Sequence, residues 1–159
     1  MEWLEKNNFV IREAHKVSKR GRKAVFAVLT DMALRYLSIK SIPGKGSYEH
    51  KLYQHIICEK LSNDNLEAKI EGRIKGFDKS IDVLGRTEDG NYIAYEVTFH
   101  FDNLLSNIHL DFAAGVSKVE IVTRDNPAME KAAVMVSEDK SLAQYGARVT
   151  FCIISDFFD

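Results

Sequence analysis

The sequence predicts an α/β protein in which helices flank a mixed central sheet, preceded by an N-terminal β-hairpin and a short helix. From residue 48 onward, apolar patterns indicate the order helix, strand, strand, strand, helix, strand, helix, strand. Apolar residues make up 45% of the 159-residue chain, which is enough for a buried core. The loop SIPGKGS, residues 41–47, is rich in turn residues and divides the chain into segments 1–42 and 43–159.

The front segment, residues 1–42, is predicted to contain a hairpin with a basic tip. FVIREAHKVS (9–18) and AVFAVLT (24–30) have the composition of strands, and KRGRK (19–23) forms the turn between them. Thr30 is a suitable cap for a short helix that follows over residues 31–39.

Basic residues gather in this front segment. Lysines and arginines outnumber acidic residues over 1–51, whereas acidic residues outnumber them over 52–159. A polyanion such as DNA would therefore meet the front segment first. A merely solvated turn would have the same composition, but clustered cations at a hairpin tip suit contacts to phosphate. The predicted DNA-binding residues are Lys16, Lys19, Arg20, Arg22 and Lys23.

The stretch YEHKLYQHIICEKLSN, residues 48–63, is predicted to be a helix capped by Ser47. Its apolar residues Leu52, Tyr53 and Ile56 share one face. Glu49 falls on the same face, because positions 49, 52, 53 and 56 follow the spacing i, i+3, i+4, i+7. We therefore expect Glu49 to point towards the edge of the core.

Strands and helices alternate over the rest of the chain. Gly115 is expected to end one helix, and Asn126 and Pro127 are expected to begin the next. The predicted elements are strands at 66–74, 117–123 and 148–154, a hairpin over 81–98 with the turn TEDGN, and helices at 101–115 and 126–138, the latter resuming at 141–145.

Two acidic residues interrupt the apolar strands of the hairpin IDVLGRTEDGNYIAYEVT. Symmetrical pairing across the turn places Asp82 close to Glu96 through Thr98 on the partner strand. At such a short distance, two carboxylates repel each other unless a proton or a cation lies between them. A hard divalent cation such as Mg²⁺, or Mn²⁺, accepts oxygen ligands and needs only one or two carboxylates. The sequence therefore predicts a metal site at Asp82 and Glu96, with Glu49 as a third carboxylate.

Several other classes of site are disfavoured. Cys58 and Cys152 each lie in an apolar run, which indicates buried thiols in a reducing cytoplasm rather than a disulfide or a zinc site. The loop PGKGS lacks the spacing of a nucleotide-binding loop. No apolar run approaches the length of a membrane span.

The pattern of Glu49, Asp82 and Glu96 resembles the PD-(D/E)XK nuclease superfamily, whose restriction-endonuclease-like core has the order αβββαβ. The resemblance covers roughly residues 45–155 and implies metal-dependent hydrolysis of DNA. Thr98 stands where that family has a catalytic lysine. The catalytic residues it implies are Glu49, Asp82, Glu96 and Thr98, and the candidate substitutes for the lysine are Lys79, His100 and His109.

The front segment resembles the second half of a winged-helix DNA-binding domain. The resemblance lies in WLEKNNFVIREAHKVSKRGRKAVFAVLTDMALRYLSI, read as the end of a recognition helix, two wing strands and a final helix. Together the two resemblances imply a DNA-processing protein. One alternative is an inactive module of the same fold, in a mobile-element, conjugation or recombination system, that binds DNA or a protein partner such as a motor ATPase. The other alternative is a structural domain that forms a homodimer.

Overall fold

The computed structural model describes all residues except 1–4, 7–9, 17–22, 31–42 and 159. The chain forms two compact units that divide after Pro43. In the first unit, strand β1 (Val10–Lys16) pairs antiparallel with β2 (Lys23–Leu29), from Val10 opposite Leu29 to Lys16 opposite Lys23. The two expected strands are therefore present. The expected turn with Lys19, Arg20 and Arg22, and the expected helix at 31–39, lie outside the described residues.

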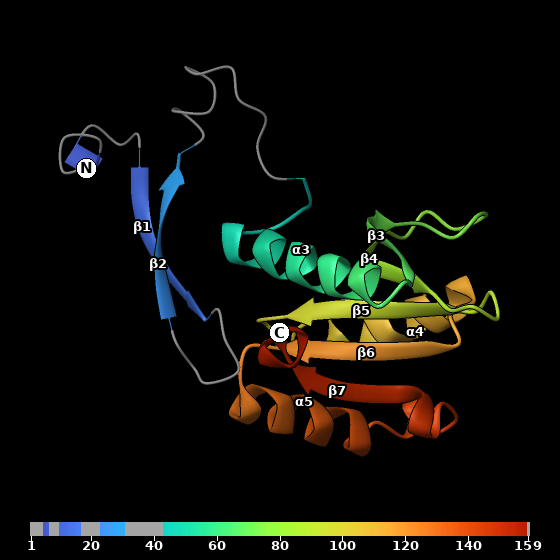
Figure 1. Cartoon of the computed structure of the whole chain (residues 1–159). Coiled ribbons are helices and arrows are strands. Elements are labelled where there is room, and N and C mark those ends of the chain that lie inside the picture. Colours follow the sequence, from blue (N-terminus) through green and yellow to red (C-terminus); the bar gives the residue numbers. More distant parts are fainter. Residues whose placement is uncertain (1–4, 7–9, 17–22, 31–42, 159) are drawn as a thin grey trace. The chain divides into compact units, whose positions relative to one another are not determined.

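The second unit is built on one five-stranded sheet with the order β3-β4-β5-β6-β7 (Figure 1). The first three strands are antiparallel neighbours, whereas β5, β6 and β7 run parallel to one another. The sheet is therefore mixed, as predicted. The strand bounds are Glu67–Gly72 for β3, Ile81–Arg86 for β4, Tyr92–Thr98 for β5, Lys118–Thr123 for β6 and Val149–Ile153 for β7.

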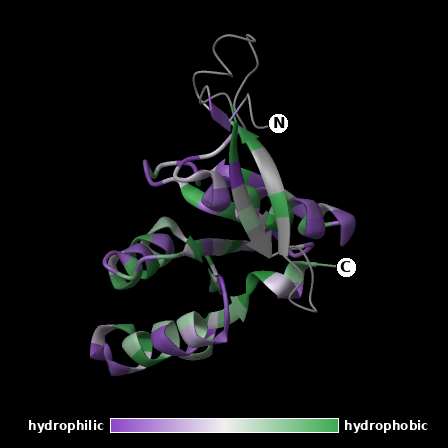
Figure 2. Cartoon of the chain, turned by 90° about the vertical axis from the view of Figure 1, so that its left-hand side faces the viewer, coloured by the Kyte–Doolittle hydropathy of each residue, from purple (hydrophilic) through white to green (hydrophobic). Residues whose placement is uncertain are grey.

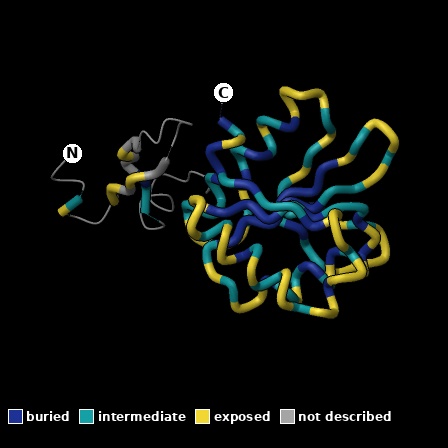
Figure 3. The backbone as a smooth tube through the Cα atoms, turned by 90° about the horizontal axis from the view of Figure 1, so that it is seen from below, coloured by how far each residue is buried: buried dark blue, intermediate teal, exposed yellow. Residues whose placement is uncertain are grey.

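Helices cover both faces of this sheet, which confirms the predicted α/β architecture. Helix α3 (Tyr48–Asn63) and the short 3₁₀ helix η3 (Ile154–Phe157) enclose one core, which includes Tyr53, Val83 and Val97. Helices α4 (Leu104–Ala114) and α5 (Asn126–Glu138) enclose the other. Figure 3 shows buried residues concentrated along the central strands and exposed ones on the outer turns. None of the helices in the described part of the chain is long and apolar enough to span a membrane.

Local signals set most of the helix ends. Ser47 caps α3 by accepting a hydrogen bond from the His50 backbone N–H at 3.2 Å, and Gly115 follows α4 at φ +99°, as predicted. The cap of α5 is Asp125, which accepts from the Ala128 N–H, and not Asn126. Asp125 adopts the extended conformation that a cap requires, and Asn126 is already helical. Between α5 and β7, the chain forms two 3₁₀ turns, η1 (Lys140–Leu142) and η2 (Gly146–Arg148), where the sequence predicts that the helix resumes.

The buried stripe of α3 is shifted from the predicted one. Tyr53, Ile57 and Leu61 are buried, while Leu52 and Ile56 only border the core. The shift also buries Gln54. Figure 2 shows hydrophilic and hydrophobic residues alternating along the helices, the pattern of a helix with one covered face.

Candidate functional site

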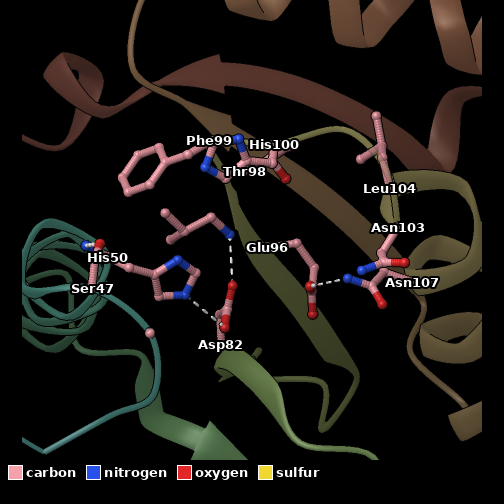
Figure 4. A pocket seen from close by; sticks show the side chains of 12 residues that line it. Ser47, His50, Asp82, Glu96, Thr98, Phe99, His100, Asn103, Leu104 and Asn107 are labelled. Atoms are coloured by element: carbon pink, nitrogen blue, oxygen red, sulfur yellow. Dashed lines mark hydrogen bonds and ion pairs between the residues drawn. The ribbon is translucent and has the colours of Figure 1, made fainter.

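A cavity of about 460 Å³ opens where strand β5 ends and helices α3 and α4 begin (Figure 4). It combines carboxylates with hydroxyl, imidazole and amide groups from both faces of the sheet. In an open α/β sheet, ligands bind beyond the carboxyl ends of parallel strands, which is where this cavity lies. Its lining residues are Gly46, Ser47, His50, Asp82, Glu96, Val97, Thr98, Phe99, His100, Asn103, Leu104 and Asn107.

The carboxylate of Asp82 accepts two hydrogen bonds and lies beside an imidazole. The ladder between β4 and β5 ends at Val83 opposite Tyr95, and beyond it the Val97 N–H donates to Asp82 Oδ2 at 2.9 Å. Gln54 Nε2 donates to Asp82 Oδ1 at 3.0 Å, and His50 Nε2 lies 3.0 Å from the same oxygen. The hairpin thus places Asp82 beside Val97, where symmetrical pairing predicts it.

Glu96 is the opposite case: it is buried and only weakly hydrogen-bonded. Its side chain is 8% exposed, and its two contacts are long, at 3.4 Å from Lys79 Nζ and 3.5 Å from Asn107 Nδ2. Burial raises the pKa of Glu96 well above its ordinary value, and the charges of Asp111 and Asp82 add to the increase, while Lys79 opposes it. The carboxyl group of Glu96 therefore lacks the positive charge that would fully compensate it.

Lys79 is the cation nearest to Glu96 among the described residues. Its ammonium group comes from the loop before β4, contacts Asp111 Oδ1 and donates to the Asn107 carbonyl at 3.0 Å. Asp111 is fully buried, and burial raises its pKa to about 6 although Lys79 opposes the change. One ammonium group is thus shared by two carboxyl groups.

Negative charge is in excess around the cavity. Four carboxyl groups, those of Glu71, Asp82, Glu96 and Asp111, are matched by the two ammonium groups of Lys45 and Lys79. A divalent cation would restore the balance, and Mg²⁺ is commonly held by one or two carboxylates and several waters. The described residues contain no cluster of three or more His, Cys, Asp or Glu arranged around a metal position. The fit of a divalent cation to this cavity therefore rests on the two carboxylates of Asp82 and Glu96.

Of the other predicted site residues, Thr98 and His100 line the cavity, whereas Glu49 and His109 do not. Glu49 does not line the cavity: Arg124 holds it in a two-point ion pair, with contacts of 3.1 and 2.6 Å, and the Tyr53 hydroxyl donates to it at 3.2 Å. Thr98 lines the cavity and is buried, and His100 lines it and is exposed. His109 instead contacts Ser141 Oγ at 2.8 Å.

Sequence reasoning missed the polar residues that support the site, namely His50, Gln54, Glu71 and Asp111. A signal was available for Asp111. It follows Leu104 and Ile108 at the spacing i, i+4, i+7, so the only acid of helix α4 lies on its buried face. For Gln54 the signal is its position on α3, because it lies one turn after His50 and beside the buried stripe.

Comparison with known proteins gives no match: no family model, curated protein or solved structure is significantly similar to the chain. What the cavity does must therefore be inferred from its own residues.

Proposed function

We propose that this protein processes DNA, and that its second unit hydrolyses phosphodiester bonds with Mg²⁺ or Mn²⁺. One observation carries the proposal: Asp82 and Glu96, from neighbouring strands, line one cavity, and Glu96 lacks full compensation of its charge. The order of one helix, three strands, one helix and one strand also agrees with the core of the nuclease superfamily that the sequence resembles.

Each residue of the cavity has a role in this proposal. Asp82 and Glu96 would hold the cation, and a bound cation would polarise the scissile phosphate and activate a water molecule. Lys79 would supply positive charge beside Glu96, where the family's lysine is replaced by Thr98. The hydroxyl of Thr98 would hold the attacking water in the cavity. Glu49 would contribute only if its ion pair with Arg124 opened.

The first unit would grip the phosphate backbone. Lys16 and Lys23 form the last backbone pair of the β1–β2 ladder, and the sequence between them contains Lys19, Arg20 and Arg22. Cations gathered at one end of a hairpin bind DNA without sequence preference and lose affinity as salt is raised.

A second candidate function is a module of the same fold that binds DNA, or a protein partner such as a motor ATPase or recombination protein, without cleaving. It is favoured by the bonds that the site groups already make. Both oxygens of Asp82 accept hydrogen bonds from the protein, and Lys79 is engaged by Asp111 and Asn107.

Cleavage of supercoiled and branched DNA separates these candidates. We expect the purified chain to nick DNA with Mg²⁺ or Mn²⁺, and the folded Asp82→Asn variant to lose this activity. Asp89→Asn is the matched control, because Asp89 is exposed in the β4–β5 turn. DNA binding without cleavage under either metal would favour the non-catalytic module. Nicking that persists in Asp82→Asn would contradict the assignment of the site.

A further inference from the structure

Gln54 is a buried amide that bridges two carboxylates. Its side chain is fully inaccessible to solvent, and its Nε2 donates to Glu71 Oε1 and to Asp82 Oδ1, both at 3.0 Å. Ionised carboxylates only accept hydrogen bonds, so the nitrogen of the amide must face them and the oxygen must face away. The orientation of this side chain is therefore set by its partners.

The backbone on the other side of Gln54 leaves room for that orientation. Gly44, at φ +115°, lies against Gln54 Oε1, and a Cβ at this position would collide with the oxygen. Among the described residues, Oε1 accepts no hydrogen bond. A buried amide oxygen without a partner is unfavourable, so the two bonds from Nε2 must provide the compensation.

Glu71, at the second end of the bridge, is itself firmly held. Its carboxylate accepts from Ser80 Oγ and from the Lys45 N–H at 3.1 Å, and Lys45 Nζ lies 3.2 Å away. Burial acts to raise the pKa of Glu71, but the bonds from Ser80, Gln54 and Lys45 outweigh it and lower the pKa. Its backbone is at φ +51°, a conformation that costs a residue other than glycine and persists where its surroundings fix it.

These bonds restrict what Asp82 can offer to the cavity. An ionised carboxylate has about four lone-pair positions. Gln54 donates to Oδ1 and the Val97 N–H donates to Oδ2, while His50 Nε2 also lies 3.0 Å from Oδ1. Oδ2 is therefore the less crowded oxygen, which suits binding of a cation through a single oxygen.

We propose that Gln54, anchored by Glu71, is a positioning residue that holds the Asp82 carboxylate in one orientation towards the cavity and thereby sets its affinity for a divalent cation. This inference rests on the proposed function, since it assigns the cation to Asp82. Neither Gln54 nor Glu71 lines the cavity, so both act through Asp82. Groups that orient a metal ligand typically change metal affinity about 10–100-fold when they are removed.

Calorimetric titration of the full chain with Mn²⁺ tests the inference without any need for cleavage. Gln54→Met keeps the length of the side chain and removes both donors, so we expect it to bind Mn²⁺ about 10–100-fold more weakly than the wild type. Gln144→Met is the matched control, because Gln144 is exposed and donates only to the Ser141 carbonyl. It should bind as the wild type does.

Glu71→Gln is the second variant, since it nearly preserves shape and tests the anchor if Gln54→Met does not fold. We expect weaker Mn²⁺ binding here too, and faster solvent exchange of the Gln54 side-chain amide protons in NMR spectra. Cleavage lost in either variant should return as the Mn²⁺ concentration is raised, which a purely structural defect would not do.

The possible failures can be told apart. Wild-type affinity in folded Gln54→Met and Glu71→Gln would overturn the positioning role and leave the proposed function intact. A wild-type chain that binds neither Mn²⁺ nor Mg²⁺ would instead overturn the metal-dependent function, together with the role assigned to Gln54.

Discussion

The two walls of the cavity hold their acids in different ways. On the α3 side, Asp82 accepts hydrogen bonds from an amide and a backbone N–H, and the imidazole of His50 lies 3.0 Å from one of its oxygens. On the α4 side, Glu96 and Asp111 share the single ammonium group of Lys79. The first wall surrounds a charge with oriented dipoles, whereas the second leaves two buried carboxyl groups competing for one cation.

This difference shows where the site needs positive charge. The hydrogen bonds from Gln54 and Val97 fix the orientation of the Asp82 carboxylate, so it is positioned to act as a ligand. The buried, weakly bonded Glu96 favours a proton or a cation instead. A divalent cation shared by Asp82 and Glu96 would supply the positive charge that Glu96 lacks.

The largest expected effect comes from removing the shared cation. Lys79→Met leaves Glu96 and Asp111 buried without an ammonium group, and breaking a buried ion pair in this way costs about 3–5 kcal/mol of unfolding free energy. Urea unfolding at neutral pH measures the loss. Lys75→Met, at an exposed position of the same loop, is the control and should be neutral. An unchanged unfolding midpoint in Lys79→Met would mean that the α4 wall does not depend on this charge.

The next effect tests the α3 wall. Asp82→Asn replaces one acceptor oxygen by an NH₂ group, which must face a donor from Gln54 or from the Val97 backbone. Hydrogen bonds to a charged group contribute about 1.5–3 kcal/mol, and we expect a destabilisation in that range. Thermal unfolding of Asp82→Asn beside Asp89→Asn measures it. Equal stability of the two variants would show that these two donors do not stabilise Asp82.

On the α4 wall the same type of substitution should have the opposite sign. Glu96→Gln removes a buried carboxyl group whose charge is disfavoured by burial and by Asp111 and Asp82, so we expect the metal-free protein to become more stable at neutral pH. Urea unfolding in EDTA measures the gain. A loss as large as that of Asp82→Asn would remove the distinction between the two walls.

The same variant should alter the dependence of stability on pH. The pKa of Glu96 is higher in the folded chain than in the unfolded one, so the folded state binds more protons and loses stability as pH rises above the unfolded value towards the folded one. Glu96→Gln should reduce this slope. Part of the slope should remain, because the pKa of Asp111 is also raised, to about 6. An identical pH profile in the wild type and the variant would contradict the assignment.

How far the sequence predicts this site depends on the range of the interactions involved. Ser47, Gly115 and the hairpin partner of Asp82 follow from local chemistry, since caps and tight turns involve residues close in the chain. The sequence indicates Lys79 only as one of three candidates for the missing lysine, because its contact with Asp111 joins residues that are 32 positions apart. Such a contact exists only after the helix has packed on the sheet.

Gln54 and Glu49 show the same limit on one helix. A shift of the buried stripe of α3 by one position was enough to bring Gln54 to Asp82 and to leave Glu49 beside Arg124. Sequence periodicity identifies a helix and its covered side, but the rotation of that helix is set by packing against the strands.

The smallest expected effect concerns this displaced carboxylate. The Arg124 side chain is 52% exposed, and its ion pair with Glu49 should contribute no more than about 1 kcal/mol, less in high salt. Arg124→Gln should therefore cost little in urea unfolding at low salt and less still in 0.5 M NaCl. It also removes the ion pair of Glu49, which would allow this acid to serve as the third ligand that the sequence predicts. Because Glu49 lies outside the cavity lining, we expect the affinity for Mn²⁺ in calorimetric titration to stay at the wild-type value. Tighter binding in Arg124→Gln would instead show that Arg124 keeps Glu49 away from the metal, and the α3 wall would then contain a charged ligand as well as dipoles.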